Sequence, residues 1–534
     1  MNIQEISNIY TALPQCGAFI NTISDKSVRH VFLKGMLASS ASVFFAAVAN
    51  RKEWLRPKGE ERKSKGEDTK VLTAVFVLQD NDEAGYFYHD LTQILSTDNV
   101  LFFPSSYRRA VKYGQRDAAN EILRTETLSR LAATADGKGN DANKFLYVVT
   151  CPEALSELVV SKRRLDERTI NVEVGDIIEL ADFGRKLRGF GFKEVDYVYE
   201  PGQFAMRGSI VDVYSYSSEL PFRIDFFGDE VDTIRTFEVA DQLSKDPKQS
   251  IQIVPELAQL TEEKHPFTSI LPEDALLVVK DRLYLCTTIE QIYGDGFSQQ
   301  ALTERLEGAT EVEQEQIIRD MRKENNLVSP IKFREEICRF RLVEFGTQSS
   351  GTPQSTIAFN ISAQPLFHKN FELLTQTLED YLLKGYKLYI LADSEKQTRR
   401  LKEIFESDEL RNMRNMRHAK SANSEALSVA DDIVFTPVDH TLHEGFADND
   451  LRLCFFTDHQ IFDRFHKYNL KSDAARTGKM ALTMKELQEM EPGDFIVHVD
   501  FGIGKFGGLV RVPVGDSYQE AIRIYYQRGD IVDV

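Results

Sequence analysis

Residues 35–42 read GMLASSAS and stand where a phosphate-binding loop would join a predicted strand to a predicted helix. A working loop needs the pattern G-x-x-x-x-G-K-[ST], because glycine amides surround the phosphates and the lysine neutralises their charge. Gly35 and Ser42 fit this pattern, but Ser40 replaces the second glycine and Ala41 replaces the lysine. We therefore predict a degenerate loop that binds no nucleotide. Weak anion binding through backbone amides is the alternative.

Two arginines and a phenylalanine could form a protein-binding surface. Arg207 and Arg223 alternate with apolar residues in predicted strands, so both guanidinium groups can project from one face, beside Phe227. Arginine and aromatic side chains together are typical of binding hot spots. The same spacing allows a structural alternative, in which Phe227 lies in the core and the arginines pair with carboxylates of the sheet, namely Asp212, Asp225 or Glu219. Spacing alone does not separate the two interpretations.

No other set of residues predicts a catalytic or metal site. His440 and His443 are the closest histidine pair, but they lack the cysteine or carboxylate partners of a metal centre. Asp431-Asp432 and His459 are expected in polar turns. The five cysteines show no CxxC spacing, so neither a zinc site nor a disulfide framework is expected. We predict no catalytic residue, no metal and no cofactor.

The composition is that of a protein with several globular cores. At 534 residues the chain has room for about three to five domains. Its net charge of −18 disfavours a general nucleic-acid coat protein. The chain has neither an apolar stretch long enough to cross a bilayer nor the residue order of a signal peptide, so we expect a cytoplasmic protein without membrane contact.

Strands alternate with helices in the first 150 residues. Continuous apolar runs at 30–35, 70–78, 100–103 and 145–149 suit parallel strands that are buried on both faces. Helices are predicted at 42–50, 82–95 and 116–132, and the charged stretch 51–70, with Trp54, is predicted to be a surface loop. This alternation indicates a doubly wound α/β layer.

The pattern changes at residue 152 and changes back later. A helix is predicted to open at Asp176 with a capping box to Glu179, and strands follow in the segments SIVDVYS, PFRIDFF and VDTIRTFEV, with turns at Pro201-Gly202 and Gly228-Asp229. One charged helix is predicted over 304–324 and a linker over 346–354. A second α/β unit is expected from a helix at 370–383, a strand at 387–392, a helix at 394–405 and strands near 432–436 and 451–456. A charged helix at 483–490 and a glycine-rich β segment end the chain.

The stretch from Gly189 to Ser244, with PGQFAMRGSIVDVY and LPFRIDFFGDEVDTIRTF, resembles the interaction domain shared by the excision-repair protein UvrB and the transcription-repair coupling factors (Mfd). In those families the two arginines and the last phenylalanine of the motif contact UvrA. The resemblance therefore implies that Arg207, Arg223 and Phe227 bind UvrA.

Three features favour the coupling factors over UvrB. UvrB keeps a working phosphate loop and inserts a tyrosine-rich hairpin, whereas Phe103-Pro104 here leads through SSYRRAVKYGQR directly into a helix. Its basic residues, Arg108, Arg109, Lys112 and Arg116, are interpreted as a solvated helix start. Residues 492–508, PGDFIVHVDFGIGKFGG, are similar to the RNA-polymerase-interaction domain of Mfd and of the CarD regulators, although Phe501 replaces the second histidine of that pattern.

The second resemblance implies a contact with the RNA polymerase β subunit. We expect Gly502, Gly504, Gly507 and Gly508 to allow the bends of a small barrel. The strand that follows, with Leu509, Val510, Arg511 and Val512, is expected to offer an open edge for strand addition.

These resemblances imply an α/β multidomain chain, with a degenerate helicase-like α/β layer, an inserted α+β domain, a second α/β domain and a small C-terminal bent β-barrel of the Tudor/CarD type. The expected domains are 1–151, 152–240 (UvrA-binding), 241–345, a linker at 346–354, 355–471 of unassigned role, and 474–534, a polymerase-interaction domain that is expected to be truncated.

The implied function is that of a monomeric adaptor that binds stalled RNA polymerase and recruits UvrA for transcription-coupled nucleotide excision repair. ATP, magnesium and most DNA contacts would belong to motor domains that this chain lacks. The alternatives are a UvrB-like excision-repair helicase subunit and a CarD-like polymerase-binding regulator.

Overall fold

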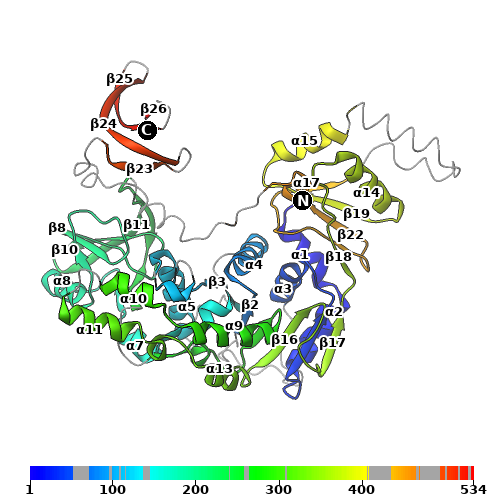
Figure 1. Ribbon diagram of the computed structural model, residues 1–534, viewed down its shortest axis with the longest axis horizontal. Helices are drawn as coiled ribbons and strands as arrows, with labels where there is room; N and C mark the ends of the chain where they lie inside the picture. The colour runs from blue at the N-terminus through cyan, green and yellow to red at the C-terminus, as the bar shows by residue number, and fades with distance from the viewer. Residues whose placement is uncertain are drawn as a thin grey trace. The chain divides into compact units, whose positions relative to one another are not determined.

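The computed structural model describes residues 1–51, 71–95, 99–107, 110–114, 116–135, 145–239, 241–257, 264–306, 310–405, 407, 434–464, 468, 493–498, 502–514, 517–526 and 531–533. The chain divides into two compact units, residues 1–475 and 476–534, and each is described by itself (Figure 1). The predicted loop with Trp54, the predicted helix at 483–490, Asp431-Asp432 and Phe501 lie outside the described residues.

A seven-stranded parallel sheet forms the centre of the first unit, in the order β17-β1-β16-β15-β2-β4-β3. Its strands are β1 (His30–Lys34), β2 (Leu72–Val77), β3 (Val100–Phe103), β4 (Phe145–Thr150), β15 (Leu276–Val279), β16 (Arg341–Gly346) and β17 (Ser355–Ala358). The strands β2, β3 and β4 are almost wholly buried, as their continuous apolar runs predict. The strand β15 is buried as well, although no strand is predicted there from the sequence. The doubly wound α/β layer is confirmed.

The helices cover both faces of this sheet. The chain moves from β1 to β2 and on to β3, then returns through β4, β15 and β16, so right-handed crossovers place the outgoing and returning helices on opposite faces. Figure 1 shows α3 (Ser40–Asn50) and α4 (Asn81–Ile94) on one side, and α9 (Arg282–Asp295) and α13 (Pro330–Ile337) on the other. Two N-terminal helices, α1 (Gln4–Thr11) and α2 (Pro14–Ser24), pack against α3, and α5 (Ala118–Ala135) packs against β3.

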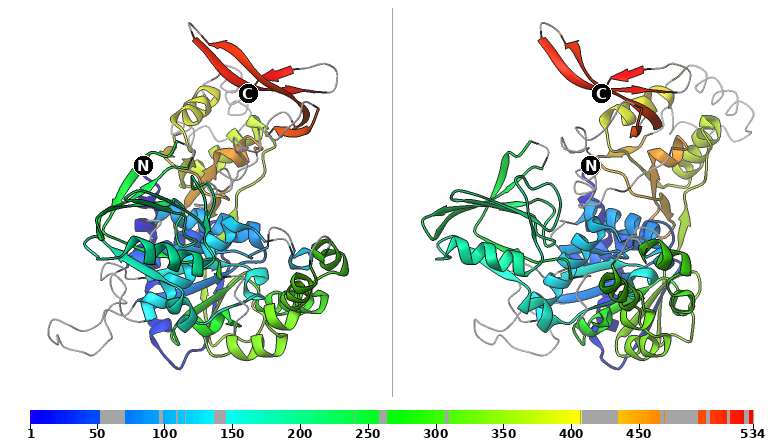
Figure 2. Two further views of the ribbon diagram at one scale, coloured as in Figure 1. Left: turned by 90° about the vertical axis from the view of Figure 1, so that its left-hand side faces the viewer. Right: turned by 60° about the vertical axis from the view of Figure 1, so that its left-hand side comes forward.

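An α+β insert interrupts the layer between β4 and β15. Its six-stranded sheet has the order β12-β11-β10-β9-β8-β7. The strands are β7 (Lys193–Glu194), β8 (Gln203–Arg207), β9 (Ile210–Val213), β10 (Phe222–Phe227), β11 (Glu230–Phe237) and β12 (Ser244–Lys248). The helix α8 (Leu180–Gly189) lies along one face, where apolar side chains of the alternating strands form a separate core (Figure 2, right).

The hairpin predicted at Gly228-Asp229 is confirmed, because β10 and β11 pair from Phe227 to Glu230 across it and Gly228 has a φ of +67°. The predicted capping box is wrong. The helix begins at Leu180, and the Asp176 side chain accepts a hydrogen bond from the Glu173 amide. Residues 177 and 178 stay extended because their backbone pairs with the end of the β10–β11 hairpin.

Two further expectations need correction. The single charged helix predicted over 304–324 is divided into α10 (Gln299–Leu306), α11 (Glu311–Asp320) and α12 (Lys323–Asn326). The stretch 346–354 does not lead to a new sheet. The strand after it, β17, pairs with β1 at the edge of the seven-stranded sheet.

A second, five-stranded sheet follows, in the order β18-β21-β22-β19-β20. Its strands are β18 (Ile361–Ala363), β19 (Lys387–Leu391), β20 (Thr436–Val438), β21 (Phe446–Asp448) and β22 (Leu453–Thr457). The helices α14 (Phe371–Leu383) and α15 (Glu395–Phe405) confirm the predicted helices, and Asn370 caps α14 through its side chain. In the described part of the chain no helix is both long and apolar enough to cross a membrane.

The second unit contains an antiparallel meander of four described strands, β23 (Phe495–His498), β24 (Gly502–Val514), β25 (Ser517–Tyr525) and β26 (Ile531–Asp533). Its glycines serve two purposes. Gly502 and Gly508 have positive φ, and the register shifts between Phe506 and Leu509. At Gly507, a Cβ atom would lie 2.4 Å from the ring of Tyr525, so this position needs a residue without a side chain.

Candidate functional site

Arg207 and Arg223 both bind one buried carboxylate on the face of the insert sheet opposite α8. The register places Ala205 on β8, Asp212 on β9 and Arg223 on β10 side by side. Arg223 donates through Nε to Oδ1 of Asp212 at 2.7 Å and through Nη2 to Oδ2 at 2.9 Å, while Arg207 donates to the same Oδ2. Asp212 is 0% exposed, so its charge depends on these two guanidinium groups.

Each arginine is also held by a backbone carbonyl and an aromatic ring. Arg207 donates to the Asp196 carbonyl at 3.0 Å and lies 4.7 Å from the ring centre of Tyr197. Arg223 donates to the Gln242 carbonyl at 3.1 Å and lies 4.5 Å from the ring centre of Phe237. The hydrogen bonds that Arg223 donates to the Asp212 carboxylate raise the pKa of Arg223. The structural alternative is therefore correct in one part: both arginines pair with a carboxylate of the sheet, and that carboxylate is Asp212.

The two arginines differ in how much surface they offer. The Arg207 side chain is 35% exposed, whereas the Arg223 side chain is 16% exposed. Of the other two carboxylates considered, Asp225 pairs with Arg235, and Glu219 accepts a hydrogen bond from Tyr214 through its carbonyl. Arg207 is therefore the arginine of the pair that a partner could reach. Arg223 is more buried and pairs with the Asp212 carboxylate.

Phe227 does not lie in the core. It is 82% exposed at the end of β10, on the strand face that also carries Arg223 and Asp225. Ile177 is 84% exposed, and its backbone pairs with Glu230, which is also the partner of Phe227. The end of this hairpin therefore presents two large apolar side chains to solvent.

Ile177 is a candidate that the sequence pattern missed. The helix predicted to open at Asp176 places Ile177 in its first turn, where an apolar residue would face the core. The sequence does contain one signal for an exposed Ile177, because this residue directly follows the turn at Gly175-Asp176. In the structure the extended backbone after that turn pairs with the hairpin and does not enter the core.

The degenerate loop has no space for the lysine that it lacks. Ser40, Ala41 and Ser42 are all buried at the start of α3, so a lysine at position 41 would have to displace packed atoms. Gly35 has a φ of +88°, and a Cβ atom there would lie 2.2 Å from the Phe359 carbonyl oxygen. The Phe359 carbonyl oxygen thus occupies the space beside Gly35.

The predicted polymerase-binding strand lies in β24. Residues 509–512 pair with residues 522–519 of β25 along one edge. Along the other edge, β23 pairs with β24 only through residues 502–505, and Phe506 bonds to Gly493 and Asp494. Among the described residues nothing pairs with this second edge at 509–512.

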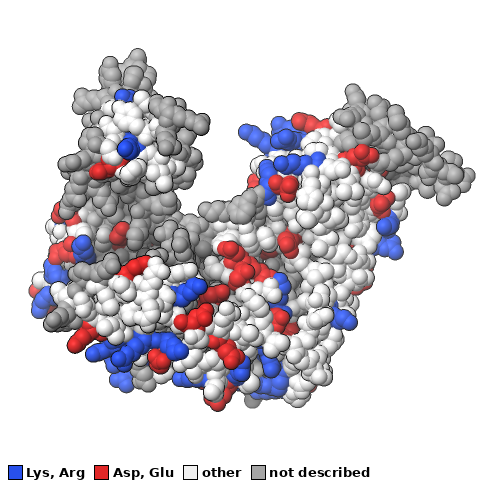
Figure 3. Space-filling model, viewed as in Figure 1, with Lys and Arg blue, Asp and Glu red and all other residues white. Residues whose placement is uncertain are grey.

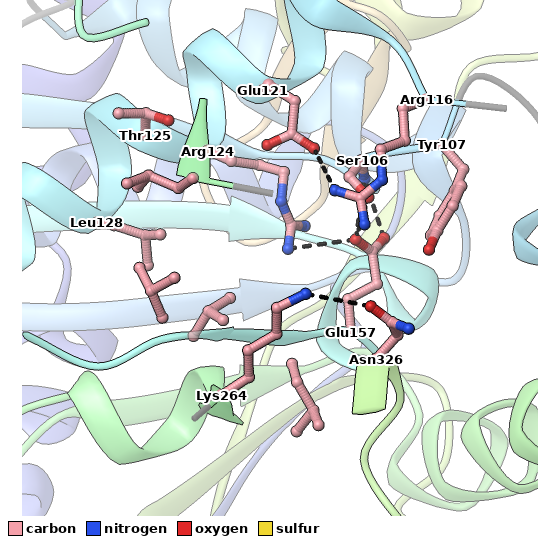
Figure 4. A pocket seen from close by; sticks show the side chains of 14 residues that line it. Ser106, Tyr107, Arg116, Glu121, Arg124, Thr125, Leu128, Glu157, Lys264 and Asn326 are labelled. Atoms are coloured by element: carbon pink, nitrogen blue, oxygen red, sulfur yellow. Dashed lines mark hydrogen bonds and ion pairs between the residues drawn. The ribbon is translucent and has the colours of Figure 1, made fainter. Parts of the chain in front are cut away.

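The segment after β3 forms a buried charge cluster and not a solvated helix start (Figure 4). Glu157 accepts hydrogen bonds from the Ser105 hydroxyl at 2.7 Å and the Ser106 amide at 2.9 Å, and lies 3.3 Å from Arg124. Arg116 is mostly buried and lies 3.6 Å from Glu121. The interpretation of Arg116 as solvated is wrong, whereas Lys112 is exposed, and Arg108 and Arg109 lie outside the described residues.

The cavity inside this cluster has a volume of about 30 Å³, which fits a water molecule but no larger ligand. Burial raises the pKa of Glu121 to about 7, although Arg116 and Arg124 oppose the rise. The cluster is best explained as an internal support that joins α5 to the strand β5 (Leu158–Val160).

A larger cavity of about 480 Å³ lies where β19 and β20 end, beside the start of α15. Its charged lining carries both signs, in Arg399 and Lys402 on one hand and Asp393, Glu395 and Asp439 on the other. Figure 3 shows the same mixture of basic and acidic side chains over α15. No ligand class is favoured by such a lining.

The histidines have structural contacts. His440 lies 3.2 Å from Asp439, and His459 donates through Nε2 to the His443 carbonyl at 2.8 Å. Across the described ranges, no three His, Cys, Asp or Glu side chains are placed to hold a metal ion.

Comparison with protein families gives two matches. Residues 170–258 match the family described as the UvrB interaction domain, and residues 490–534 match the family described as the CarD-like/TRCF RID domain. The first match covers the insert sheet with Arg207, Arg223 and Phe227, and the second covers β23 to β26.

Comparison with curated proteins finds transcription-repair-coupling factors. The protein from Staphylococcus aureus (strain bovine RF122 / ET3-1) is 22% identical over 491 residues, which cover 83% of this chain and 40% of the relative. The protein from Bacillus subtilis (strain 168) is 22% identical over 585 residues, which cover 98% of this chain and 46% of the relative. The chain thus spans less than half the length of these relatives.

Proposed function

Because this chain is related over most of its length to the N-terminal region of transcription-repair-coupling factors, we propose that it is the adaptor part of such a factor. The insert recruits UvrA, and residues 490–534 bind the β subunit of RNA polymerase that has stalled at a lesion. The adaptor thereby brings nucleotide excision repair to the transcribed strand. It acts as a cytoplasmic monomer.

The observation that carries this proposal is the exposed Phe227 on a face whose arginines are already fixed. Arg207 and Arg223 are held by Asp212, carbonyls and aromatic rings, so little side-chain freedom is lost when a partner binds. An exposed aromatic beside ordered arginine is the composition of a binding hot spot. The match to the UvrB interaction domain supports UvrA as the partner.

The polymerase contact is supported by the open edge of β24. Strand addition uses backbone amides and carbonyls, so it tolerates sequence divergence at residues such as Phe501. The described strands leave the edge unpaired at residues 509–512, which is what this mode of binding requires.

The chain contributes no ATP hydrolysis of its own in this proposal. In this proposal the seven-stranded sheet is a degenerate helicase-like layer, since its loop at residues 35–42 lacks the lysine, and the four strands of the second unit belong to a small bent barrel. ATP, magnesium and translocation on DNA belong to further domains of the longer relatives.

The test is binding of the whole chain to purified UvrA, with two single variants. Phe227→Ala removes an exposed ring, and Arg207→Ala leaves Asp212 paired with Arg223. We expect each to weaken binding about tenfold or more, which corresponds to roughly 1.4 kcal/mol. The matched controls are Ile331→Ala, an exposed apolar residue on α13, and Arg185→Ala, an exposed arginine on α8, and both should bind like wild type.

Failure of the folded wild-type chain to bind UvrA would contradict the proposal and favour a CarD-like polymerase-binding regulator. ATP hydrolysis by the isolated chain, lost on substitution of Gly35, would favour a UvrB-like helicase subunit.

A further inference from the structure

The helices α3 and α4 contact a loop from the second sheet, about 350 residues later in the chain. This docking loop, residues 441–445, joins β20 to β21. The His443 amide donates to Oδ1 of Asp90 at 2.8 Å, and the Glu444 amide donates to the Ser39 hydroxyl at 2.9 Å. Two successive backbone amides of the loop therefore have acceptors on the first sheet's helices.

The two acceptors, Asp90 and Ser39, are buried. If the loop amides left, water could not replace these hydrogen bonds without a loss of folding free energy. Asp90 and Ser39 are 2% and 3% exposed. Ser39 belongs to the degenerate loop, directly before α3, and Asp90 lies on α4. The His443 amide is one donor to the buried Asp90 carboxyl, beside the hydroxyls of Ser39 and Ser42, so Asp90 would lose part of its hydrogen bonding if the docking loop left.

Aromatic contacts extend the docking along α4. The ring of Tyr86 stacks on the ring of His443, with 3.6 Å between centres and 14° between planes. Tyr468 lies edge-on to Tyr86, and its hydroxyl donates to Asp82 at 3.2 Å. A Cβ atom at Gly85 would lie 2.4 Å from the Tyr468 ring, so the glycine permits this approach.

The docking loop is held in shape by its own sheet. Thr441 donates its amide to Asp393, the His443 carbonyl accepts from His459, and Gly445 donates its amide to Gln460. With these bonds made inside the second sheet's part of the chain, the backbone amides of His443 and Glu444 point at Asp90 and Ser39.

We propose that Ser39, Tyr86 and Asp90 form a socket for the docking loop and that this socket, together with the buried apolar contacts of Leu442 and Phe446, holds the second sheet on the first. The degenerate phosphate loop is then reused: Ser39 binds a backbone amide of the same chain, at a place where a nucleotide-binding loop would face its ligand. The second sheet then has a role as a docked part of the first unit. This role does not depend on binding to UvrA or polymerase.

Hydrogen exchange of the whole chain, measured by mass spectrometry on peptides covering 440–446, tests the socket. Asp90→Asn and Ser39→Ala each remove or weaken one acceptor, and Tyr86→Ala removes the stacked ring. We expect exchange of the His443 and Glu444 amides to rise at least tenfold in Asp90→Asn and Ser39→Ala, while peptides from α14 and β19 stay as in wild type.

The matched control is Glu121→Gln, a buried carboxyl in the cluster around Arg116 and Arg124 that lies away from the docking loop. It should leave exchange at 440–446 unchanged. Unchanged exchange at 440–446 in folded Asp90→Asn and Ser39→Ala would overturn the proposal, since Asp393, His459 and Gln460 would then suffice to hold the loop. An equal rise in Glu121→Gln would overturn it too, because the effect would be general loosening.

Discussion

Asp212 determines what the two arginines of the insert can do. Because Arg207 and Arg223 share its buried carboxylate, both arginines stabilise the fold of the insert, and any contact with a partner comes in addition to this role. Removing one arginine leaves the carboxylate with the other. Removing both leaves a buried charge without a partner, so a double variant would confuse lost binding with lost folding.

We therefore predict a steep difference in stability between single and double variants. Arg207→Ala should lower the free energy of unfolding of the insert by less than about 1 kcal/mol, because the side chain is partly exposed. Arg207→Ala with Arg223→Ala should lower it by about 3–5 kcal/mol. Urea titration with hydrogen exchange on peptides from residues 205–237 measures both. Additive small losses would show that Asp212 is solvated when unpaired.

Ile177 should extend the surface around Phe227. It is exposed, so Ile177→Ala should leave the melting temperature within about 1 °C of wild type and weaken UvrA binding about threefold to tenfold. Calorimetry and titration with UvrA give the two numbers, and Leu383→Ala, an exposed apolar residue on α14, is the control. Wild-type affinity in Ile177→Ala would restrict the hot spot to Phe227 and the arginines.

At the scale of elements, backbone pairing with neighbouring strands decides whether a segment is helical or extended. Residues 177 and 178 are drawn into an extended conformation by the β10–β11 hairpin, which delays α8 to Leu180. The strand β24 is long, but only part of it has neighbours on both sides among the described strands. Its open part is the element on which polymerase binding would depend.

Proline substitution can test the open edge of β24. In an antiparallel strand the amides of adjacent residues point to opposite edges, so at Val510 and Arg511 one amide faces β25 and the other faces the open edge. We expect one of Val510→Pro and Arg511→Pro to destabilise the sheet, and the other to stay folded and lose polymerase binding about tenfold or more. Alanine at the same positions is the control for the side chains. Full binding by the folded proline variant would exclude strand addition at this edge.

At the scale of the whole molecule, contacts between distant segments join the first sheet to the second. The docking loop meets α3 and α4, and Tyr10 on α1 donates to Asp448 on β21 at 2.9 Å. The Ile3 amide donates to Asp439 at 2.9 Å. Such contacts make the stability of the first unit depend on buried polar groups at their junction.

Asp90 should make this stability depend on pH. Burial raises the pKa of Asp90 to about 7 with a further contribution from Glu444, whereas hydrogen bonds from Ser39 and His443 and the nearby Ser42 hydroxyl lower it. Between about pH 4 and 7 the folded chain holds a proton that the unfolded chain releases, so this contribution to stability falls as pH rises and is constant above about 7.

Asp90→Asn removes this titration. We expect the melting temperature of wild type minus that of Asp90→Asn to be largest near pH 5 and to shrink toward pH 8, as measured by calorimetry at four pH values. Asp25→Asn is the control, because hydrogen bonds from Ser27 lower the pKa of Asp25, and its difference should stay constant over this range. A constant difference for Asp90→Asn would mean that Asp90 does not titrate between pH 5 and 8.

Much of the architecture follows from local sequence. The strands β2, β3 and β4 are continuous apolar runs because both of their faces are buried. The turn at Gly228-Asp229 can be predicted because Gly228 tolerates the positive φ that the turn requires. The loss of the phosphate loop's lysine is likewise visible in the residues themselves. These features depend on neighbours within a few positions, so a single sequence is enough to predict them.

Other features were decided only by tertiary structure. Alternation in β10 places Arg223 and Phe227 on one face, but only the folded sheet shows that α8 covers the opposite face and that one buried Asp212 takes both arginines. The place of β17 in the first sheet and the docking of residues 441–445 on Ser39 and Asp90 join segments hundreds of positions apart. Local propensity carries no information on such pairings, because their free energy arises from burial and hydrogen bonds that exist only once the chain has folded.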